Sequence, residues 1–324
     1  MSTPVRDPSA PFSRRHLLKW GLGAAGAVIV AGAAGVELVN TGVLPGKQIL
    51  DQLDGACSVP MPTLDYATLG PSMEGTFFSH ARHQEVGFTL AYPHSRAPGD
   101  EVAVVVMLHG FGGDHRDAFV DMTPAQAAAL VAHLVATSSL TLYAPVAVAT
   151  VDGGGGYWNP HPGDDPMAMV VEEFIPMLQA RGLGRRSTGV GLMGISMGGY
   201  GALAIAESYP QLVRCVAAIS PAVWTSFDQA RAANDGAFAS AATFTTYNII
   251  ANAGQLQVPS VRVASGVDDP FHPGVVQLLK VLPPNVVTYV GQGCHSTPFF
   301  VSQEPASLAF LASHLSSVAV ASRV

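Results

Sequence analysis

A serine flanked by glycines carries the most specific chemistry in this sequence. A β-prone run (190–193) meets Gly194-Ile195-Ser196-Met197-Gly198, and a helix-prone stretch of small residues follows. This is the G-x-S-x-G pattern in the strand–turn–helix context that it needs. The glycines leave room for a strained turn, and the helix N-terminus directs N–H groups toward charge beside Ser196. The pattern predicts a nucleophile, against the alternative of a plain glycine-rich corner.

An acid and a histidine follow Ser196 in the chain order expected of a serine hydrolase. Of the 11 His, His295 is singled out because it follows the last predicted strand in a glycine-flanked loop. Asp268 and Asp269 follow an earlier strand, where an acid can orient a histidine and stabilise its charged form. Asp269 is favoured because it adjoins the turn-forming Pro270, and Asp268 remains the alternative.

A glycine-rich loop, His109-Gly110-Phe111-Gly112-Gly113, follows the first predicted parallel strand. Such a loop supplies the second half of an oxyanion hole, whose first half is the N–H after the nucleophile. We therefore expect the N–H groups of Met197 and Phe111 to be the donors, with Gly112 as the alternative to Phe111. His109 is expected to be a structural hydrogen-bonding residue.

Aromatic residues lie near the same predicted rim. Four glycines (153–156) precede Tyr157 and Trp158, and Trp224 follows the strand after the Ser196 helix. We expect Tyr157, Trp158 and Trp224 to line an acyl or sugar pocket, although a surface loop would have the same composition.

These motifs resemble those of the "Putative esterase" (esterase D-like) family of α/β-hydrolases, a branch that includes the secreted mycolyltransferase antigens. The matching segments are HGFGG (109–113), GISMGGYGAL (194–203), GVDDPF (266–271) and GCH (293–295). The resemblance implies an α/β-hydrolase fold with Ser196 as nucleophile, Asp269 as acid and His295 as base. It also implies Phe111 and Met197 as oxyanion donors.

The chain departs from the family pattern after the histidine. The usual nearby aromatic residue is replaced by Ser296-Thr297-Pro298-Phe299-Phe300, so we expect a different pocket beside His295. Residues 1–76 lie outside the resemblance.

The elements that must position these residues alternate between strand and helix patterns, which predicts an α/β fold with a mostly parallel, doubly wound sheet. The expected strands are 77–82 and 85–92 (antiparallel), 101–108, 140–149, 190–193, 213–220, 261–265 and 285–290. The expected helices are 124–136, 167–181, 197–206, 274–282 and 305–318, with a helical or irregular insertion at 225–257. In such sheets ligands bind beyond the carboxyl ends of the strands, where every candidate loop falls.

The N-terminus predicts export. Ser13–Lys19 resembles a twin-arginine signal, and an uncharged Gly/Ala-rich run (20–36) follows it with an A-x-A cleavage pattern at 31–33. An uncleaved membrane anchor is the alternative. We therefore expect a signal or anchor at 1–36, a wrapping extension at 37–76 and a catalytic domain at 77–324. The protein would be secreted or associated with the cell envelope.

The three cysteines are too few for a disulfide framework. Three free thiols is the simplest expectation, with a Cys57–Cys294 bridge conceivable outside the cytoplasm. Cys215 lies in an apolar run and is expected in the core.

Composition and residue spacing argue against nucleic-acid binding and metal binding. The net charge of −7 and the 12% of charged residues argue against a nucleic-acid partner. His161, Asp164 and Asp165 have metal-ligand side chains but no recognisable spacing, so we expect neither metal nor cofactor.

The leading hypothesis is an exported serine esterase that hydrolyses small-molecule or lipid esters through an acyl-enzyme. One alternative is a mycolyltransferase-like acyltransferase with a sugar or glycerol acceptor. An alternative of another class is a non-catalytic envelope-binding module, which an intact set of serine, acid and base disfavours.

Overall fold

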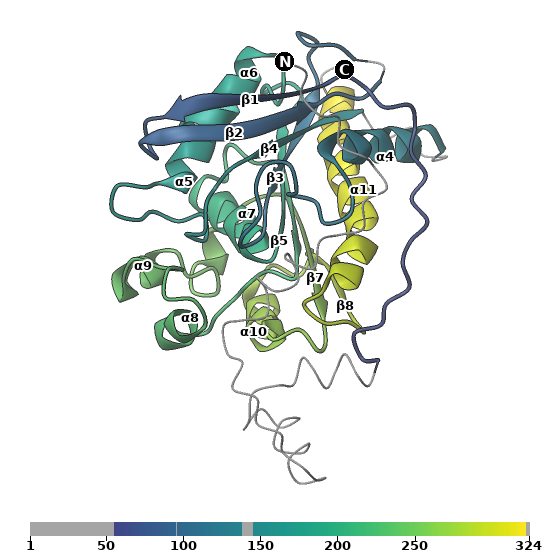
Figure 1. Cartoon of the computed structure of the whole chain (residues 1–324). Coiled ribbons are helices and arrows are strands. Elements are labelled where there is room, and N and C mark those ends of the chain that lie inside the picture. Colours follow the sequence, from purple (N-terminus) through teal and green to yellow (C-terminus); the bar gives the residue numbers. More distant parts are fainter. Residues whose placement is uncertain (1–54, 95, 138–144, 322–324) are drawn as a thin grey trace, which may run out of the picture. The chain divides into compact units, whose positions relative to one another are not determined.

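The fold is built on a mostly parallel sheet. The computed structural model describes residues 55–94, 96–137 and 145–321. In this part of the chain one sheet has the strand order β1-β2-β4-β3-β5-β6-β7-β8 (Figure 1). The strands are β1 (Ser72–Ser79), β2 (Gln84–Ala91), β3 (Ala103–Leu108), β4 (Val146–Val151), β5 (Val190–Ile195), β6 (Cys215–Ile219), β7 (Ser260–Gly266) and β8 (Val287–Gly291). The β1–β2 and β2–β4 pairs are antiparallel and the others are parallel, which confirms the predicted fold class.

The central strands bring the candidate loops together. Every residue of β3, β4, β5 and β6 is buried, as expected for apolar runs covered on both faces. Leu108 pairs with Gly194, and Gly194 pairs with Ala218, so these strands end at the same edge. The loops that contain Phe111, Ser196 and Trp224 therefore start side by side.

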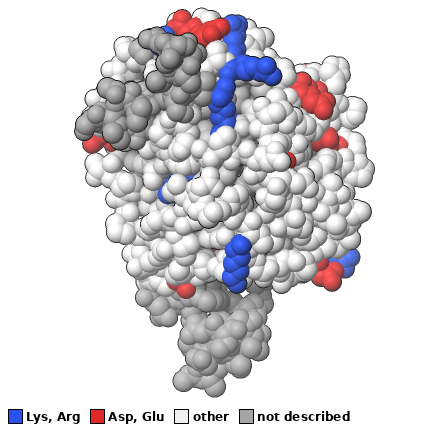
Figure 2. All heavy atoms as spheres, turned by 180° about the vertical axis from the view of Figure 1, so that it is seen from behind, with Lys and Arg blue, Asp and Glu red and all other residues white. Residues whose placement is uncertain are grey.

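Helices cover both faces of this sheet (Figure 1). On one face, α4 (Pro124–Thr137) and α11 (Thr297–Ala321) enclose a core that includes Met107, Ile195 and Phe299. The other face is covered by α5 (Pro166–Ala168), the π-helical η1 (Met169–Phe174), α6 (Ile175–Ala180), α7 (Met197–Ser208) and α10 (His272–Val281). The insertion contains α8 (Phe227–Ala233), α9 (Ala241–Thr246) and the 3₁₀ turn η2 (Ala253–Gln255). Seen from behind, the surface is mostly uncharged, with one small group of Lys and Arg side chains near the top and isolated charged side chains elsewhere (Figure 2).

Three elements start five or more residues away from their expected positions. The strand expected at 140–149 is observed at Val146–Val151, and 138–144 lie outside the described residues. β1 starts at Ser72, inside the stretch predicted as an extension. The prediction that the last helix starts at Pro305 is wrong, because α11 starts at Thr297 and contains Pro305. The fully or largely buried Phe299, Phe300 and Val301 provide packing that offsets the hydrogen bond lost at the proline.

The expectation of three free thiols is also wrong, and the Cys57–Cys294 bridge given as its alternative is present. Cys57 and Cys294 form a disulfide, and only Cys215 is a free, buried cysteine among the described residues. The bridge joins residues 237 positions apart, a separation that the sequence gives no reason to prefer. Burial raises the pKa of the Cys215 thiol to about 12, as expected for an inert core cysteine.

The predicted signal at 1–36 and residues 37–54 of the predicted extension lie outside the described residues. The described part belongs to one compact unit, Asp51–Val324. Within it, no helix has both the length and the apolar character needed to cross a membrane.

A buried carboxyl group ties α11 to the loop that follows β3. Glu304 is fully buried, and one of its oxygens accepts a hydrogen bond from the Val120 N–H (3.0 Å), while the other has no partner among the described residues. Burial, together with the nearby Asp121, raises the pKa of Glu304 to about 7, although the Val120 N–H opposes this shift. Folding therefore favours the protonated form.

This shift predicts a pH dependence of stability. A folded-state pKa above the unfolded value gives stability that is complete below about pH 4.5 and is lost as the pH rises through about 7. The loss amounts to about 3 kcal/mol. Glu304→Gln keeps an acceptor for Val120 and removes the titration. Urea unfolding at about pH 5 and about pH 8 should show a smaller loss of stability in the variant. Equal losses in both proteins would contradict the assignment.

Candidate active site

The turn at Ser196 has the geometry of a nucleophile elbow. Ser196 links β5 to α7 with φ 56° and ψ −118°, a strained conformation for a residue with a side chain. A Cβ at Gly194 would collide with the Gly198 backbone, and a Cβ at Gly198 would collide with the backbone of Leu108. The two glycines are therefore required by close backbone contacts. The Ser196 N–H donates to the Ile219 carbonyl (2.9 Å), which holds the turn against β6.

A chain of hydrogen bonds runs from Ser196 to a buried carboxylate. His295 Nε2 lies 2.8 Å from Ser196 Oγ, and His295 Nδ1 lies 2.9 Å from Asp269 Oδ2. The Asp269 side chain is fully buried, and its other oxygen accepts from the Phe271 N–H (2.8 Å). Both carboxylate oxygens are thus held in place, and of the two adjacent aspartates it is Asp269 that contacts His295.

Two phenyl rings flank the His295 imidazole. Phe271 and Phe300 each lie 5.0 Å from it, centroid to centroid, in edge-on arrangements. Phe271 comes from the loop of Asp269, and Phe300 from the first turns of α11. The sequence predicts a departure from the family pattern at residues 296–300, and Phe300 from this segment contacts the His295 ring.

The loop after β3 lies against the elbow. A Cβ on Gly110 would lie 3.7 Å from the Ser196 Cβ. The Gly113 N–H donates to the Gly110 carbonyl (3.1 Å), and Gly112 has φ 81°, which together describe a type II turn with Phe111 in its second position. This turn leaves the Phe111 N–H outside its own hydrogen bond. The Met197 N–H, in the first turn of α7, has no acceptor within the helix.

His109 holds this loop in place through two hydrogen bonds. Its Nε2 accepts from the Gly153 N–H (2.9 Å), so the proton is on Nδ1, which donates to the Gly110 carbonyl (2.8 Å). Burial lowers the pKa of His109, which keeps the ring neutral, as these two bonds require. The structural role expected for His109 matches these contacts.

The predicted aromatic residues lie deeper than expected. Trp158 is fully buried: it packs on His109 with the ring centroids 5.0 Å apart and covers Gly153 and Gly201. The prediction that Trp158 lines an accessible pocket is therefore wrong, because the adjacent glycines make space for its ring inside the core. Tyr157 is also buried and contacts Trp224 (4.8 Å).

Trp224 is connected to His295 through Phe271. Its ring lies 5.4 Å from Phe271, which in turn contacts His295. At the rim, the Phe111 side chain is 45% exposed and its ring lies beside Gly155. Phe111 is thus exposed at the rim, whereas the nearly buried Trp224 is connected to His295 only through Phe271.

The family model described as "Putative esterase" matches residues 79–271, which is more than half of the chain. The chain belongs to this esterase family. No functionally curated protein matches it in sequence.

Solved structures share the fold of this esterase. An S-formylglutathione hydrolase from Agrobacterium tumefaciens is 16% identical, with a TM-score of 0.62 over 79% of the esterase and 100% of that chain. A ferulic acid esterase is 17% identical (TM-score 0.59; 76% and 98% covered). The fluorophosphonate-binding serine hydrolase FphF of Staphylococcus aureus is 13% identical (TM-score 0.59; 75% and 99% covered). The esterase is therefore an α/β hydrolase-fold protein.

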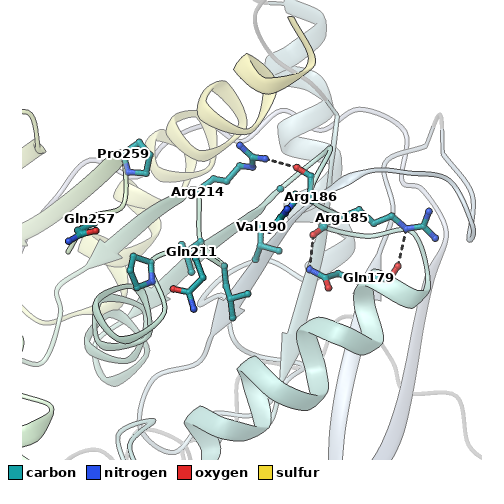
Figure 3. A pocket seen from close by; sticks show the side chains of 13 residues that line it. Gln179, Arg185, Arg186, Val190, Gln211, Arg214, Gln257 and Pro259 are labelled. Carbon is teal, nitrogen blue, oxygen red and sulfur yellow. Dashed lines mark hydrogen bonds between the residues drawn. The ribbon is translucent and has the colours of Figure 1, made fainter. Parts of the chain in front are cut away.

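Other features of the esterase lie apart from the serine. A cavity of about 700 Å³ lies at the start of β5, and Arg185, Arg186 and Arg214 are among its lining residues (Figure 3). The opposite ends of the strands carry the candidate site, so no predicted site residue lines this cavity.

The residues with metal-ligand side chains have other partners. Asp164 pairs with Arg82 (2.7 Å), Asp165 caps α5, and His161 bonds the Gly156 carbonyl. In the described part of the chain no cluster of His, Cys, Asp and Glu could hold a metal ion.

Proposed function

We propose that this chain is an exported serine esterase that hydrolyses carboxylic esters through a covalent acyl-enzyme. The observation that carries the proposal is the hydrogen-bonded chain from Asp269 through His295 to Ser196, with Ser196 on a strained strand-to-helix turn. Membership of the esterase family supports an ester as the substrate.

In the first half-reaction, Ser196 Oγ attacks the ester carbonyl while His295 Nε2 takes the hydroxyl proton. Asp269 stabilises the imidazolium and holds Nδ1 toward itself. The tetrahedral intermediate collapses when His295 gives the proton to the departing alkoxide, leaving an acyl-Ser196 ester. Water then repeats the sequence with His295 as base, which releases the acid and restores the serine.

The N–H groups of Met197 and Phe111 stabilise the oxyanion in this proposal. The first lies at the positive end of α7, where a developing negative charge is stabilised. The second projects from the β3 loop that packs against the elbow. Removing one such donor costs about 10²–10³ in kcat in a well-studied protease.

A proline at position 111 should test this donor. Phe111 occupies the second position of a type II turn, which proline favours, so Phe111→Pro removes the N–H and preserves the turn. We expect kcat to fall about 10²–10³-fold. Phe111→Ala is the matched control, because it removes the ring and keeps the N–H; it should change KM and leave kcat within a few-fold. If both variants keep their kcat, Gly112 is the donor.

We propose that Phe111 and Trp224 border the bound ester and that the buried Tyr157 packs against Trp224. This assignment uses the exposed Phe111 ring and the contact of Trp224 with Phe271 beside His295. A short p-nitrophenyl ester serves as a general trial substrate, and the names of the structural neighbours suggest methyl ferulate and an S-formyl thioester as two more.

The test joins labelling with product analysis. A fluorophosphonate probe should modify Ser196 in the folded protein, as located by peptide mass spectrometry. Absence of an adduct, together with no turnover of any trial ester, would favour the non-catalytic binding module. Adding a sugar or glycerol to the reaction distinguishes the two enzymes: free acid alone supports hydrolysis, and a new ester identifies an acyltransferase.

Export is proposed on two grounds. The N-terminal residues resemble a twin-arginine signal, and the Cys57–Cys294 disulfide is typical of oxidising compartments outside the cytoplasm. Fractionation of expressing cells, with Arg14→Lys/Arg15→Lys as the export-deficient control, should place the wild-type protein outside the cytoplasm. Unchanged fractionation of this variant would contradict the route.

A further inference from the structure

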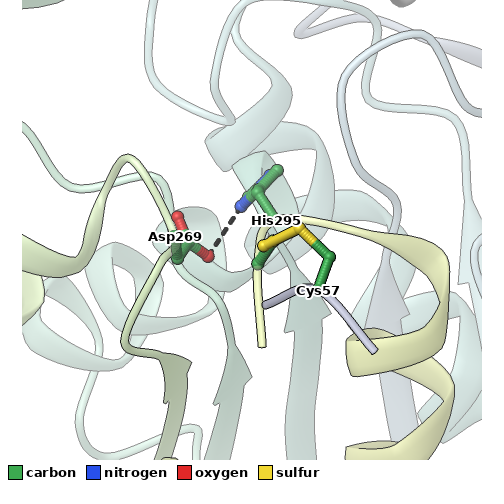
Figure 4. Close-up of a disulfide and its surroundings, with 4 residues drawn as sticks. Cys57, Asp269 and His295 are labelled. Atoms are coloured by element: carbon green, nitrogen blue, oxygen red, sulfur yellow. Dashed lines mark hydrogen bonds and ion pairs between the residues drawn. A yellow bond between two sulfur atoms is a disulfide. The ribbon is translucent and has the colours of Figure 1, made fainter. Parts of the chain in front are cut away.

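The single disulfide of the described chain lies beside the site. Cys294 is the residue immediately before His295, and its partner Cys57 comes from the segment that precedes the sheet (Figure 4). Both cysteines are buried. The bridge therefore connects the backbone that carries the candidate base to a distant part of the chain.

The segment from 57 to 71, here named the strap, is fixed along its length. Val59, Leu64 and Tyr66 pack against the core between the sheet and the helices α4 and α11. The Ala67 N–H donates to the Ala129 carbonyl of α4 (3.2 Å). At the end of the strap, the Tyr92 N–H donates to the Pro71 carbonyl (2.8 Å). The strap can thus act as a firm anchor for Cys57.

The His295 loop has backbone restraints on one side. It follows β8, which is an edge strand and pairs only with β7. The Val267 and Asp268 N–H groups donate to the carbonyls of Gly291 (2.9 Å) and Gly293 (3.0 Å), which fixes the loop toward β7. No strand lies on the other side of β8 among the described elements, and there the bridge from Cys294 to the strap supplies the connection.

We propose that the Cys57–Cys294 bridge positions His295, so that Cys57 and Cys294 are positioning residues and full ester turnover requires the oxidised bridge. This inference rests on the proposed function. A dithiol breaks the S–S bond by thiol–disulfide exchange: it is oxidised to its own disulfide and Cys57 and Cys294 each become a thiol. The loop then keeps its bonds toward β7 and its continuation into α11, and it loses its covalent connection to the strap.

Reduction should lower kcat and leave KM nearly unchanged, because the bridge acts on the base and does not border the ester. A misplacement of about 1 Å costs about 10²-fold in rate. We expect a fall of about 10- to 100-fold in kcat, and an equal fall in the rate of fluorophosphonate labelling, which also requires an activated Ser196.

The experiment compares oxidised wild type, dithiothreitol-treated wild type, Cys57→Ala and Cys57→Ala/Cys294→Ala. The last three should have the same low kcat, and reoxidation should rescue only the treated wild type. Cys215→Ala is the control, since this free cysteine lies in the core away from the site and its loss should leave the redox response intact. Near-UV circular dichroism at the assay temperature shows which samples are folded.

A purely stabilising bridge gives a different result. Folded, reduced protein would then keep the kcat and the labelling rate of the oxidised protein, which would overturn the proposal. If Cys57→Ala does not fold, activity and near-UV signal are followed together after dithiothreitol is added to wild type. Loss of activity before loss of signal supports positioning, and coincident losses overturn it.

Failure of the proposed function gives a different result from failure of the positioning proposal. Oxidised wild type would then neither hydrolyse the trial esters nor react with the probe at Ser196. The positioning proposal fails only when the oxidised protein does both and the folded, reduced protein does both equally well.

Discussion

Ser196→Ala is expected to lower kcat by about 10⁶-fold, the loss seen when the nucleophile of a comparable serine hydrolase is removed. Ser196 Oγ is the atom within hydrogen-bond distance of His295 Nε2, and alanine leaves the histidine with nothing to deprotonate. Alanine fits the small space at the turn, so the fold should be kept. The measurement is hydrolysis of a short p-nitrophenyl ester, with fluorophosphonate labelling as a second readout.

Ser220→Ala is the matched control. Ser220 is also a buried serine at a strand end with positive φ (44°), and its hydroxyl has no hydrogen-bond partner among the described residues. Its loss should change kcat by no more than a few-fold. Retained turnover and labelling in Ser196→Ala would remove this serine from the mechanism and require another nucleophile.

The sequence was most informative where local sterics dictate the residue. Gly194 and Gly198 are required by backbone contacts at the turn, so a pattern in five residues indicated the geometry around Ser196. The apolar runs of β3 and β5 likewise identified buried parallel strands, and the chain order of the loops then placed them at one edge. These features depend on neighbours in sequence or on strand order alone.

The features that the sequence could not decide depend on distant contacts. Trp158 resembled a rim residue because it follows four glycines, but Gly153 and Gly201 provide a buried space for its ring. The pairing of Cys57 with Cys294 depends on the path of the strap across α4 and α11. No local pattern encodes that path.

The choice between the adjacent Asp268 and Asp269 depends partly on local sequence and partly on distant contacts. Proximity to Pro270 favoured Asp269 over Asp268 but could not exclude either, since both follow β7. What distinguishes them is burial: the Asp269 side chain is fully buried and shared between His295 and the Phe271 N–H, whereas Asp268 is half-buried. A sequence shows neither the direction in which a side chain points nor the residue that it contacts.

Asp269→Asn is therefore expected to lower kcat by about 10⁴-fold with little change in KM, the loss measured for the equivalent change in a serine protease. The amide keeps the shape of the carboxylate but can present an N–H to His295 Nδ1, which would favour the tautomer whose Nε2 proton blocks acceptance from Ser196. The loss of negative charge also removes the stabilisation of the imidazolium in the transition state.

Asp268→Asn is the matched control for this prediction, because it makes the same chemical change one residue away on the same loop. It should retain kcat within a few-fold. Both variants are compared with one p-nitrophenyl ester at neutral pH, and near-UV circular dichroism checks that both are folded. A large loss in Asp268→Asn alone would move the acid by one residue. Full activity in both variants would mean that His295 depends on a different acid, since a carboxylate bonded to Nδ1 at 2.9 Å in the working enzyme could not be neutralised without effect.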